Sequence, residues 1–336
     1  MKPNLFNYAT SELSQDAIIC WLLEWARIDN EIIDKKMHKL GVNFIDSFFN
    51  KFENINKPEK YINIEIKKQY KNIDILCIIN NEFAILIEDK TSTKNHSGQL
   101  EKYLKEVEEI FHISKILPIY FKTGDQSSYK RIIEKGYAIY LRTEFLKVLN
   151  STAYDNEILT DYHMYLQDIE DSVNSYKKFI LSDWKWNSWK GFYIELKKEL
   201  KEGNWDYVAN PSGGFLGFWW HFMGNNECQQ YLQIESKYNK KISAYDTSLC
   251  IKISVANQQD RKRLRKYWYE KIKNKSDDLN LKFKKPSRFG SGKYMTILVL
   301  ENDYREVDQE GIVDIKSTVQ YLHKVKSLIN DVQENH

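Results

Sequence analysis

The sequence has no long apolar run, few cysteines and almost no net charge. None of its apolar runs approaches the roughly 18 residues that a membrane-spanning helix needs, and its first residues lack the apolar core of a signal peptide. We therefore expect a cytoplasmic protein with no membrane partner. The four cysteines show neither metal-ligand spacing nor a disulfide framework, so we expect them to be reduced and buried.

The chain is nonetheless long and apolar enough to fold. Its 336 residues, 42% of them hydrophobic, predict one large or two ordinary domains and exclude disorder for most of the chain. The formal net charge of +3 argues against a nucleic-acid partner only if the charge is evenly spread. The glycine-rich motifs of nucleotide-binding proteins and the Gly-x-Ser-x-Gly turn of hydrolases are missing, which argues against those classes of enzyme.

The charge is concentrated in one segment. Residues 261–293 contain thirteen Lys or Arg and three acids, a local net charge of +10, so the rest of the chain carries −7. Such a strip is typical of a nucleic-acid footprint, although a solvated helix face explains a charge run equally well. The candidate phosphate-binding cations are Arg261, Arg263, Arg265 and Lys266.

The first half of the chain alternates helical and strand patterns. Helices are expected from Ser11 to about Ile28, over 32–52 and from Ser97 toward Phe111, and strands over 61–67, 73–79, 83–87, 116–121 and 137–141. Continuous apolar runs favour strands that are buried on both faces. The order predicts an α/β domain over residues 1–175, with a mixed sheet flanked by helices.

A change in composition marks a second domain. Six of the nine tryptophans fall within residues 184–220. Strand patterns follow over 231–236, 248–255 and 294–300, and helical patterns over 257–273 and 315–332. We expect an α+β domain over residues 176–336 that binds substrate or regulates the first domain. The tryptophans fill a core in the simpler interpretation and stack on bases in the alternative.

The residues with the clearest chemistry flank a predicted hairpin turn. Asp74 opens one apolar strand and Glu88 closes the next, so the hairpin brings both carboxylates to one end of the sheet. Strand alternation places Glu88 and Lys90 on one face and the Asp89 side chain on the other. Carboxylates and a backbone carbonyl, here that of Asp89, are ligands for Mg²⁺ or Mn²⁺. Lys90 is then placed to orient an attacking water and to offset phosphate charge.

This Asp, followed by Glu-x-Lys after one hairpin, resembles the PD-(D/E)xK nuclease superfamily, with its restriction-endonuclease-like fold, over roughly residues 8–141. Ile73 stands where the family has proline. Gln99-x-x-x-Tyr103 is similar to the Gln and Tyr motif of the RecB-type exonuclease branch, and Glu12 matches an acid that many members add as a metal ligand. The first residues also resemble those of a subgroup of uncharacterised bacterial members.

The resemblance implies a metal-dependent nuclease acting on nucleic acid, with DNA as the expected substrate. It assigns catalytic roles to Asp74, Glu88, Lys90 and Gln99, and a substrate contact to Tyr103. It makes Glu12 a metal ligand beside Asp74, Glu88 and the Asp89 carbonyl. His96, between the motifs, is a further candidate for touching substrate.

Plainer interpretations stay open beside this one. Glu-x-Lys alone is explained by an exposed ion pair, and an acid such as Glu12 or Asp16 is expected in a first helical turn because of the macrodipole. As a whole, the protein is alternatively a non-catalytic module that binds nucleic acid or a partner. In a third hypothesis the C-terminal domain senses a small ligand or phage component and switches the nuclease on in bacterial defence. A homodimer is left open.

Overall fold

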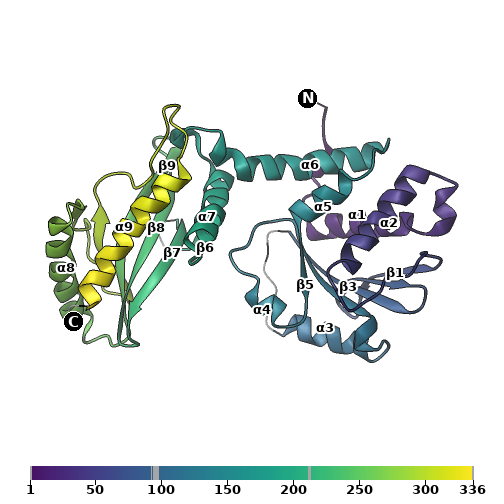
Figure 1. Cartoon of the computed structure of the whole chain (residues 1–336), viewed down its shortest axis with the longest axis horizontal. Helices are drawn as coiled ribbons and strands as arrows, with labels where there is room; N and C mark the ends of the chain where they lie inside the picture. The colour runs from purple at the N-terminus through teal and green to yellow at the C-terminus, as the bar shows by residue number, and fades with distance from the viewer. Residues whose placement is uncertain (1, 92, 94–97, 211–212, 335–336) are drawn as a thin grey trace. The chain divides into compact units, whose positions relative to one another are not determined.

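The computed structural model describes residues 2–91, 93, 98–210 and 213–334 (Figure 1). The chain divides into two compact units, Met1–Asp171 and Ser172–His336. This boundary falls inside helix α6 (Glu157–Asn174), just before the position that the sequence suggests. In the described part of the chain, no helix combines the length and apolarity that crossing a membrane requires.

The first unit is built on a mixed five-stranded sheet, which confirms the predicted α/β class. Strands β1 to β3 form an antiparallel meander, and β4 and β5 continue the sheet parallel to β3. The strands are β1 (Ile64–Tyr70), β2 (Ile73–Ile79), β3 (Phe83–Lys90), β4 (Ile116–Lys122) and β5 (Ala138–Leu141). All eight residues of β3 are buried, as expected for a strand covered on both faces.

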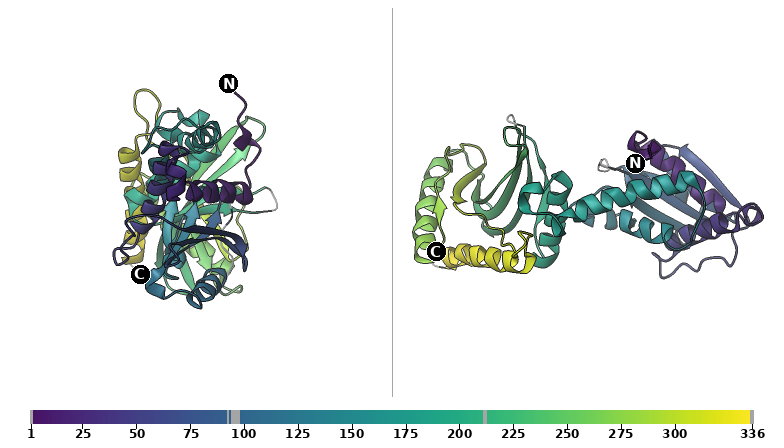
Figure 2. Two further views of the ribbon diagram at one scale, coloured as in Figure 1. Left: turned by 90° about the vertical axis from the view of Figure 1, so that its right-hand side faces the viewer. Right: turned by 90° about the horizontal axis from the view of Figure 1, so that it is seen from above.

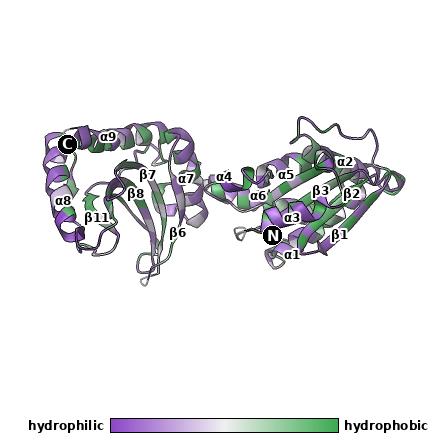
Figure 3. Ribbon diagram, turned by 90° about the horizontal axis from the view of Figure 1, so that it is seen from below, coloured by the Kyte–Doolittle hydropathy of each residue, from purple (hydrophilic) through white to green (hydrophobic). Residues whose placement is uncertain are grey.

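Helices cover both faces of this sheet, and alternate residues of β3 belong to different cores. Ile85 and Ile87 pack with α1 (Glu12–Trp25), α2 (Lys35–Phe49), α5 (Arg142–Leu149) and α6. Ala84 and Leu86 pack with α3 (Gln99–Glu108) and α4 (Lys130–Ile133). In Figure 3 this sheet is largely in the colours of hydrophobic residues.

Two local features position the end of the sheet where the acids lie. The side chain of Ser11 accepts a hydrogen bond from the Ser14 amide and so starts α1 at Glu12. Asn80 and Asn81 have φ values of 52° and 56°, in the left-handed region that tight hairpin turns use, and the Glu82 amide donates to the Ile79 carbonyl at 2.9 Å. Ile79 pairs with Phe83, so residues 80–82 connect the two strands. In this register Ile75 pairs with Ile87, so that Asp74 and Glu88 come next.

The second unit contains a six-stranded antiparallel sheet in the order β10-β11-β9-β8-β7-β6. Its strands are β6 (Asn204–Val208), β7 (Phe215–Gly224), β8 (Cys228–Asn239), β9 (Ala244–Val255), β10 (Phe283–Lys284) and β11 (Tyr294–Leu300). The helices are α7 (Trp186–Leu200), α8 (Arg261–Asp278) and α9 (Ile315–Glu334). Short 3₁₀ helices in the chain span Leu5–Asn7, Ile28–Glu31, Ile113–Lys115, Ser175–Lys177 and Leu181–Asp183.

The sequence did not predict α7, β6 or β7. In β7, Phe218, Trp219 and Trp220 are consecutive aromatics that point to alternating faces, so the apolar and polar alternation of a half-exposed strand is missing. The prediction of a tryptophan core is right for Trp184, Trp189, Trp205 and Trp220, which are buried, whereas Trp219 points to the opposite face of the sheet.

The four cysteines are free. Cys77, Cys228 and Cys250 are buried, as predicted. Cys20 is half-buried instead, because it lies at the outer edge of α1, where it lines a surface pocket beside Trp21.

Candidate active site

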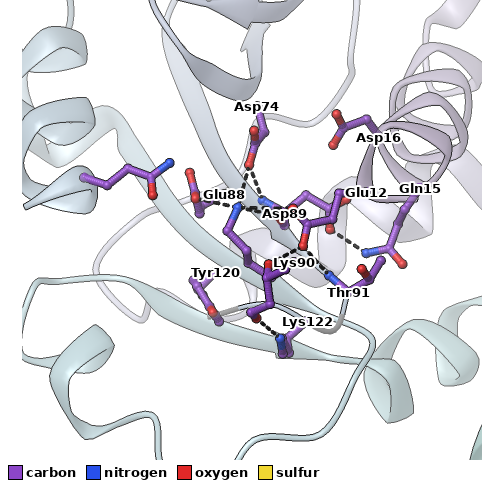
Figure 4. A network of polar contacts seen from close by, with 12 residues as sticks. Glu12, Gln15, Asp16, Asp74, Glu88, Asp89, Lys90, Thr91, Tyr120 and Lys122 are labelled. Atoms are coloured by element: carbon purple, nitrogen blue, oxygen red, sulfur yellow. Dashed lines mark hydrogen bonds and ion pairs between the residues drawn. The ribbon is translucent and has the colours of Figure 1, made fainter. Parts of the chain in front are cut away.

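Four acidic or carbonyl groups converge on the ammonium of Lys90 at the end of β3 (Figure 4). Its Nζ lies 2.7 Å from Glu88 Oε1, 3.3 Å from Asp74 Oδ2 and 3.8 Å from Glu12 Oε2. It also donates to the backbone carbonyl of Asp89 at 2.7 Å. The structure therefore brings together, around one cation, the candidate metal ligands that the sequence singled out.

Glu12 is held in this cluster by the chain that follows β3. Its Oε1 accepts hydrogen bonds from the Thr91 amide at 3.2 Å and from the Thr93 hydroxyl at 2.5 Å. Asp74 is held similarly, because its Oδ2 accepts from the Asp89 amide at 2.9 Å. The macrodipole of α1 alone does not account for the position of Glu12, since specific donors from outside the helix fix it.

Glu88 is the most deeply buried acid of the cluster, with 0% of its surface exposed. The pKa of Glu88 is raised to about 7, first because the carboxyl group is buried and second because it lies near the negative charge of Asp74. Among the described residues its Oε2 has no hydrogen-bond partner. Burial by itself would lower the pKa of Lys90, but the charges of Glu88, Asp74 and Glu12 outweigh it and the pKa is raised. Lys90 is therefore a charged, buried ammonium.

The donor set of this cluster suits a small divalent cation. Three carboxylates and one carbonyl oxygen are the ligands that Mg²⁺ prefers. The Lys90 ammonium lies among these groups. In the described ranges, no three His, Cys, Asp or Glu side chains are arranged to hold a metal. The groups fit a divalent ion in the place of the ammonium, not beside it.

A second buried cluster, which the sequence analysis missed, lies behind the first. The Asp89 side chain points to the opposite face of β3, as alternation predicts, where Gln15 Nε2 donates to its Oδ1 at 2.5 Å. The Thr123 hydroxyl donates to Gln15 Oε1 at 2.6 Å. Asp16 lies beside Asp89, and burial followed by the charge of Asp16 raises the pKa of Asp89.

Asp16 lies in the first part of α1, as the sequence analysis expected of an acid there, but it is buried, which the sequence analysis did not predict. Its side chain is 1% exposed, and burial, with a smaller contribution from Asp74, raises its pKa to about 6. The sequence holds a signal for this, because Asp16 follows Glu12 by four residues and so shares its helix face.

Replacing Asp16 by asparagine is expected to stabilise the protein more at high pH than at low pH. Folded Asp16 retains a proton up to about pH 6, whereas the unfolded chain releases it near pH 4, so the cost to the fold grows between about pH 4 and pH 6 and is complete above that. A neutral amide removes this cost, which is about 3 kcal/mol at pH 8 and small at pH 4. Urea unfolding at both pH values measures it. Exposed Asp29→Asn is the control, and equal effects at both pH values would contradict the prediction.

Lys122 is a second buried lysine near the site, also missed from the sequence. It ends β4 and pairs in parallel register with Lys90. Burial lowers its pKa to about 8, although the charge of Glu12 opposes this, and its Nζ donates to the Thr93 carbonyl. A single lysine closing an otherwise apolar strand is the signal that could have found it.

Gln99 and Tyr103 lie on α3, over the sheet face to which Glu88 points. Gln99 Nε2 donates to the Tyr103 hydroxyl at 3.0 Å, and Tyr103 packs in the core with Leu86. Tyr137 belongs to the same core. Burial raises the pKa of Tyr137, and the nearby charge of Glu88 raises it further. His96 lies outside the described residues.

The predicted phosphate-binding cations lie on α8, in the second unit. Arg261 and Arg265 donate to the carbonyls of Ser291 and Gly290, in the loop before β11. Arg263 pairs with Asp260 at 2.8 Å. Lys266 is exposed on the same helix and lies 3.9 Å from Glu270. Two of the four cations therefore also hold a loop, a role that the sequence did not predict.

Comparisons of the chain with models of known protein families and with curated proteins find no match. The family resemblance therefore rests on the motif residues themselves.

Proposed function

We propose that this chain is a metal-dependent nuclease of the PD-(D/E)xK superfamily, with a restriction-endonuclease-like first unit that hydrolyses phosphodiester bonds in DNA. The observation that carries the proposal is the set of three carboxylates and one carbonyl around the Lys90 ammonium. A structural ion pair needs one acid for one lysine. When all three acids are ionised, the ammonium balances one of their three negative charges, whereas a divalent cation in its place balances two.

At such a site the acidic residues and Lys90 would have different roles. Glu12, Asp74, Glu88 and the Asp89 carbonyl would hold Mg²⁺ or Mn²⁺. When bound, the metal polarises a phosphoryl oxygen and lowers the pKa of water. Lys90 keeps its positive charge at neutral pH, so its ammonium donates to the attacking water or to phosphate oxygens and offsets the negative charge that accumulates there.

Further features support the same proposal. The acids and the lysine lie on the first helix and on two neighbouring strands, and the strands are packed on both faces and therefore hold these groups rigidly. Lys122 places a second ammonium at the same end of the sheet, where the approach of a phosphate is favoured by positive charge. The glutamine and tyrosine of α3 lie on the Glu88 side of the sheet, where the resemblance assigns them a contact with substrate.

The test is incubation of the full chain with linear, circular and single-stranded DNA and with RNA, in Mg²⁺, in Mn²⁺ and in EDTA. We expect cleavage of at least one DNA substrate with either metal and none in EDTA, measured by gel electrophoresis. Exposed Glu82→Gln, at the far end of β3, is the control that keeps activity. Binding without cleavage in every metal condition would instead support the non-catalytic alternative.

A further inference from the structure

The two faces of the sheet in the second unit differ in what lies on them. In Figures 2 and 3, α9 lies on one side of the strands. Leu216, Phe218 and Trp220 of β7 point to that side and join the core formed with α7, α8 and α9. Phe215 and Trp219 alternate with them and point to the opposite face. Aromatic side chains on the face away from the core call for a separate explanation.

These rings line a cavity of about 430 Å³ on that opposite face. Phe215, Trp219 and Phe222 come from β7, Tyr231 from β8 and Tyr294 from β11. Phe222 is 48% exposed and Tyr294 60% exposed, so both rings are accessible to a ligand. The volume lies in the range of roughly 300–1,000 Å³ that is usual for sites of small organic ligands.

A β-bulge aims one of these rings at the cavity. The pairing of β7 with β8 shifts between Trp220 and Met223, and His221 adopts a φ of 56°, which is unfavourable for a residue with a Cβ atom. Without the shift, Phe222 would follow Trp220 to the core side. With it, Phe222 stacks on Tyr231, with ring centroids 4.8 Å apart and an interplanar angle of 14°. Bulges re-aim side chains in this way at functional sites.

Polar groups stand at fixed positions among the rings. Gln233 is 6% exposed and donates from Nε2 to Glu235 at 2.9 Å, and Lys252 pairs with the same carboxylate at 2.8 Å. Both Gln233 and Lys252 line the cavity. At its rim, the exposed Lys293 lies with its Nζ 5.5 Å from the centre of the Tyr294 ring.

We propose that this cavity binds an unpaired nucleobase. The aromatic rings offer surfaces for stacking, and the amide of Gln233 with the ammonium of Lys252 can hydrogen-bond to the polar edge of a base. Lys293 supplies a cation for the attached phosphate. A sugar carries hydroxyl groups around its whole ring, and two polar side chains among five aromatic ones suit it poorly. The inference goes beyond the proposed cleavage and uses none of the residues of the first unit.

The base can come from a free nucleotide or from a single strand of nucleic acid, and the experiment separates the two. The full chain is titrated in EDTA with each of the four deoxynucleoside 5′-monophosphates, by calorimetry, and with short fluorescent single strands and their duplex, by anisotropy. Binding of the monophosphates assigns a free nucleotide. Binding of single strands alone, in preference to the duplex, assigns a strand. Because EDTA removes metal, failure of cleavage does not affect this result.

Substitutions of cavity residues test whether the ligand binds in the cavity. We expect Trp219→Ala and Tyr294→Ala each to weaken affinity about tenfold. Tyr294 is largely exposed, so its variant keeps the fold even if the Trp219 variant does not, and thermal unfolding checks both. The control is Tyr238→Ala, which removes a ring on β8 that is 48% exposed and does not line the cavity. No binding of either probe, equal binding of duplex, or affinities unchanged in both variants would overturn the proposal.

Discussion

Replacing Lys90 by methionine destabilises the metal-free protein by about 3 kcal/mol or more at pH 8, and Mg²⁺ restores the loss. The substitution leaves the fully buried Glu88 carboxylate without the ammonium that lies 2.7 Å away, and removing one partner of a buried ion pair costs about 3–5 kcal/mol. The loss shrinks as the pH falls toward 7, because Lys90 lowers the pKa of Glu88 and the Glu88 of the variant therefore takes up a proton at a higher pH than in the native protein. Urea unfolding at pH 6 and pH 8, with EDTA or with Mg²⁺, measures these effects.

The same variant binds Mg²⁺ more tightly than the native protein but does not cleave DNA. The carboxylates no longer hold an ammonium that the metal must replace, while the group that offsets phosphate charge is missing. Metal at about 100 times its dissociation constant adds about 2.7 kcal/mol to the stability. Lys115→Met, which removes a half-buried lysine paired with Glu82, is the matched control. Mg²⁺ that stabilises the native protein and the Lys90 variant equally would show that the ammonium and the metal do not share a position.

Replacing Asp74 by asparagine reduces cleavage roughly 10³-fold and weakens Mg²⁺ binding, with the fold retained. The amide keeps the shape of the side chain and an oxygen that accepts from the Asp89 amide, but it removes one negative charge from the cation site. It also lowers the pKa of Glu88, since the charge of Asp74 is the second cause of its increase after burial. Metal titration by calorimetry and single-turnover cleavage measure the two losses.

Glu82→Gln is the matched control for this loss, because it removes an exposed carboxylate from the same hairpin. Its cleavage and metal binding are expected to equal those of the native protein. Thermal unfolding of the Asp74 variant checks that its fold is intact. Native rates of cleavage in the Asp74 variant would refute the assignment of the site, whatever the effect on stability.

The hairpin and its acids were predictable because local rules control them. A pair of asparagines readily adopts the left-handed conformation of a tight turn, and the observed connection of residues 80–82 sets a register that brings Asp74 next to Glu88. The side-chain period of two then places Glu88 and Lys90 on one face and Asp89 on the other. A Ser11 cap and the helical pattern after it likewise located α1, and the resemblance to the nuclease superfamily then singled out Glu12 on that helix as a candidate ligand.

Other features of the site depend on contacts between distant segments, which the pattern of a single segment does not contain. The sequence explained Asp16 only as an acid near a helix N-terminus, whereas α1 packs it against β3 and Asp89. Lys122 became part of the site only through the parallel pairing of β4 with β3. In the second unit, β7 was not predicted because its consecutive aromatic residues lack the apolar and polar alternation of a strand. The face on which Phe222 lies depends on a bulge at His221.

Composition and local pattern were thus sufficient for the α/β class, the buried strands and the grouping of Asp74 with Glu88, since apolar periodicity and turn chemistry act within a few residues. They placed Lys90 on the face of Glu88 but did not predict that its ammonium lies among three carboxylates. The Lys90 ammonium lies among three carboxylates because α1 brings Glu12 to the end of β3, about 80 residues further along the chain. Burial between the two helical layers then raises the pKa of Glu88 and keeps Lys90 charged, and burial of this kind arises only when the layers pack together.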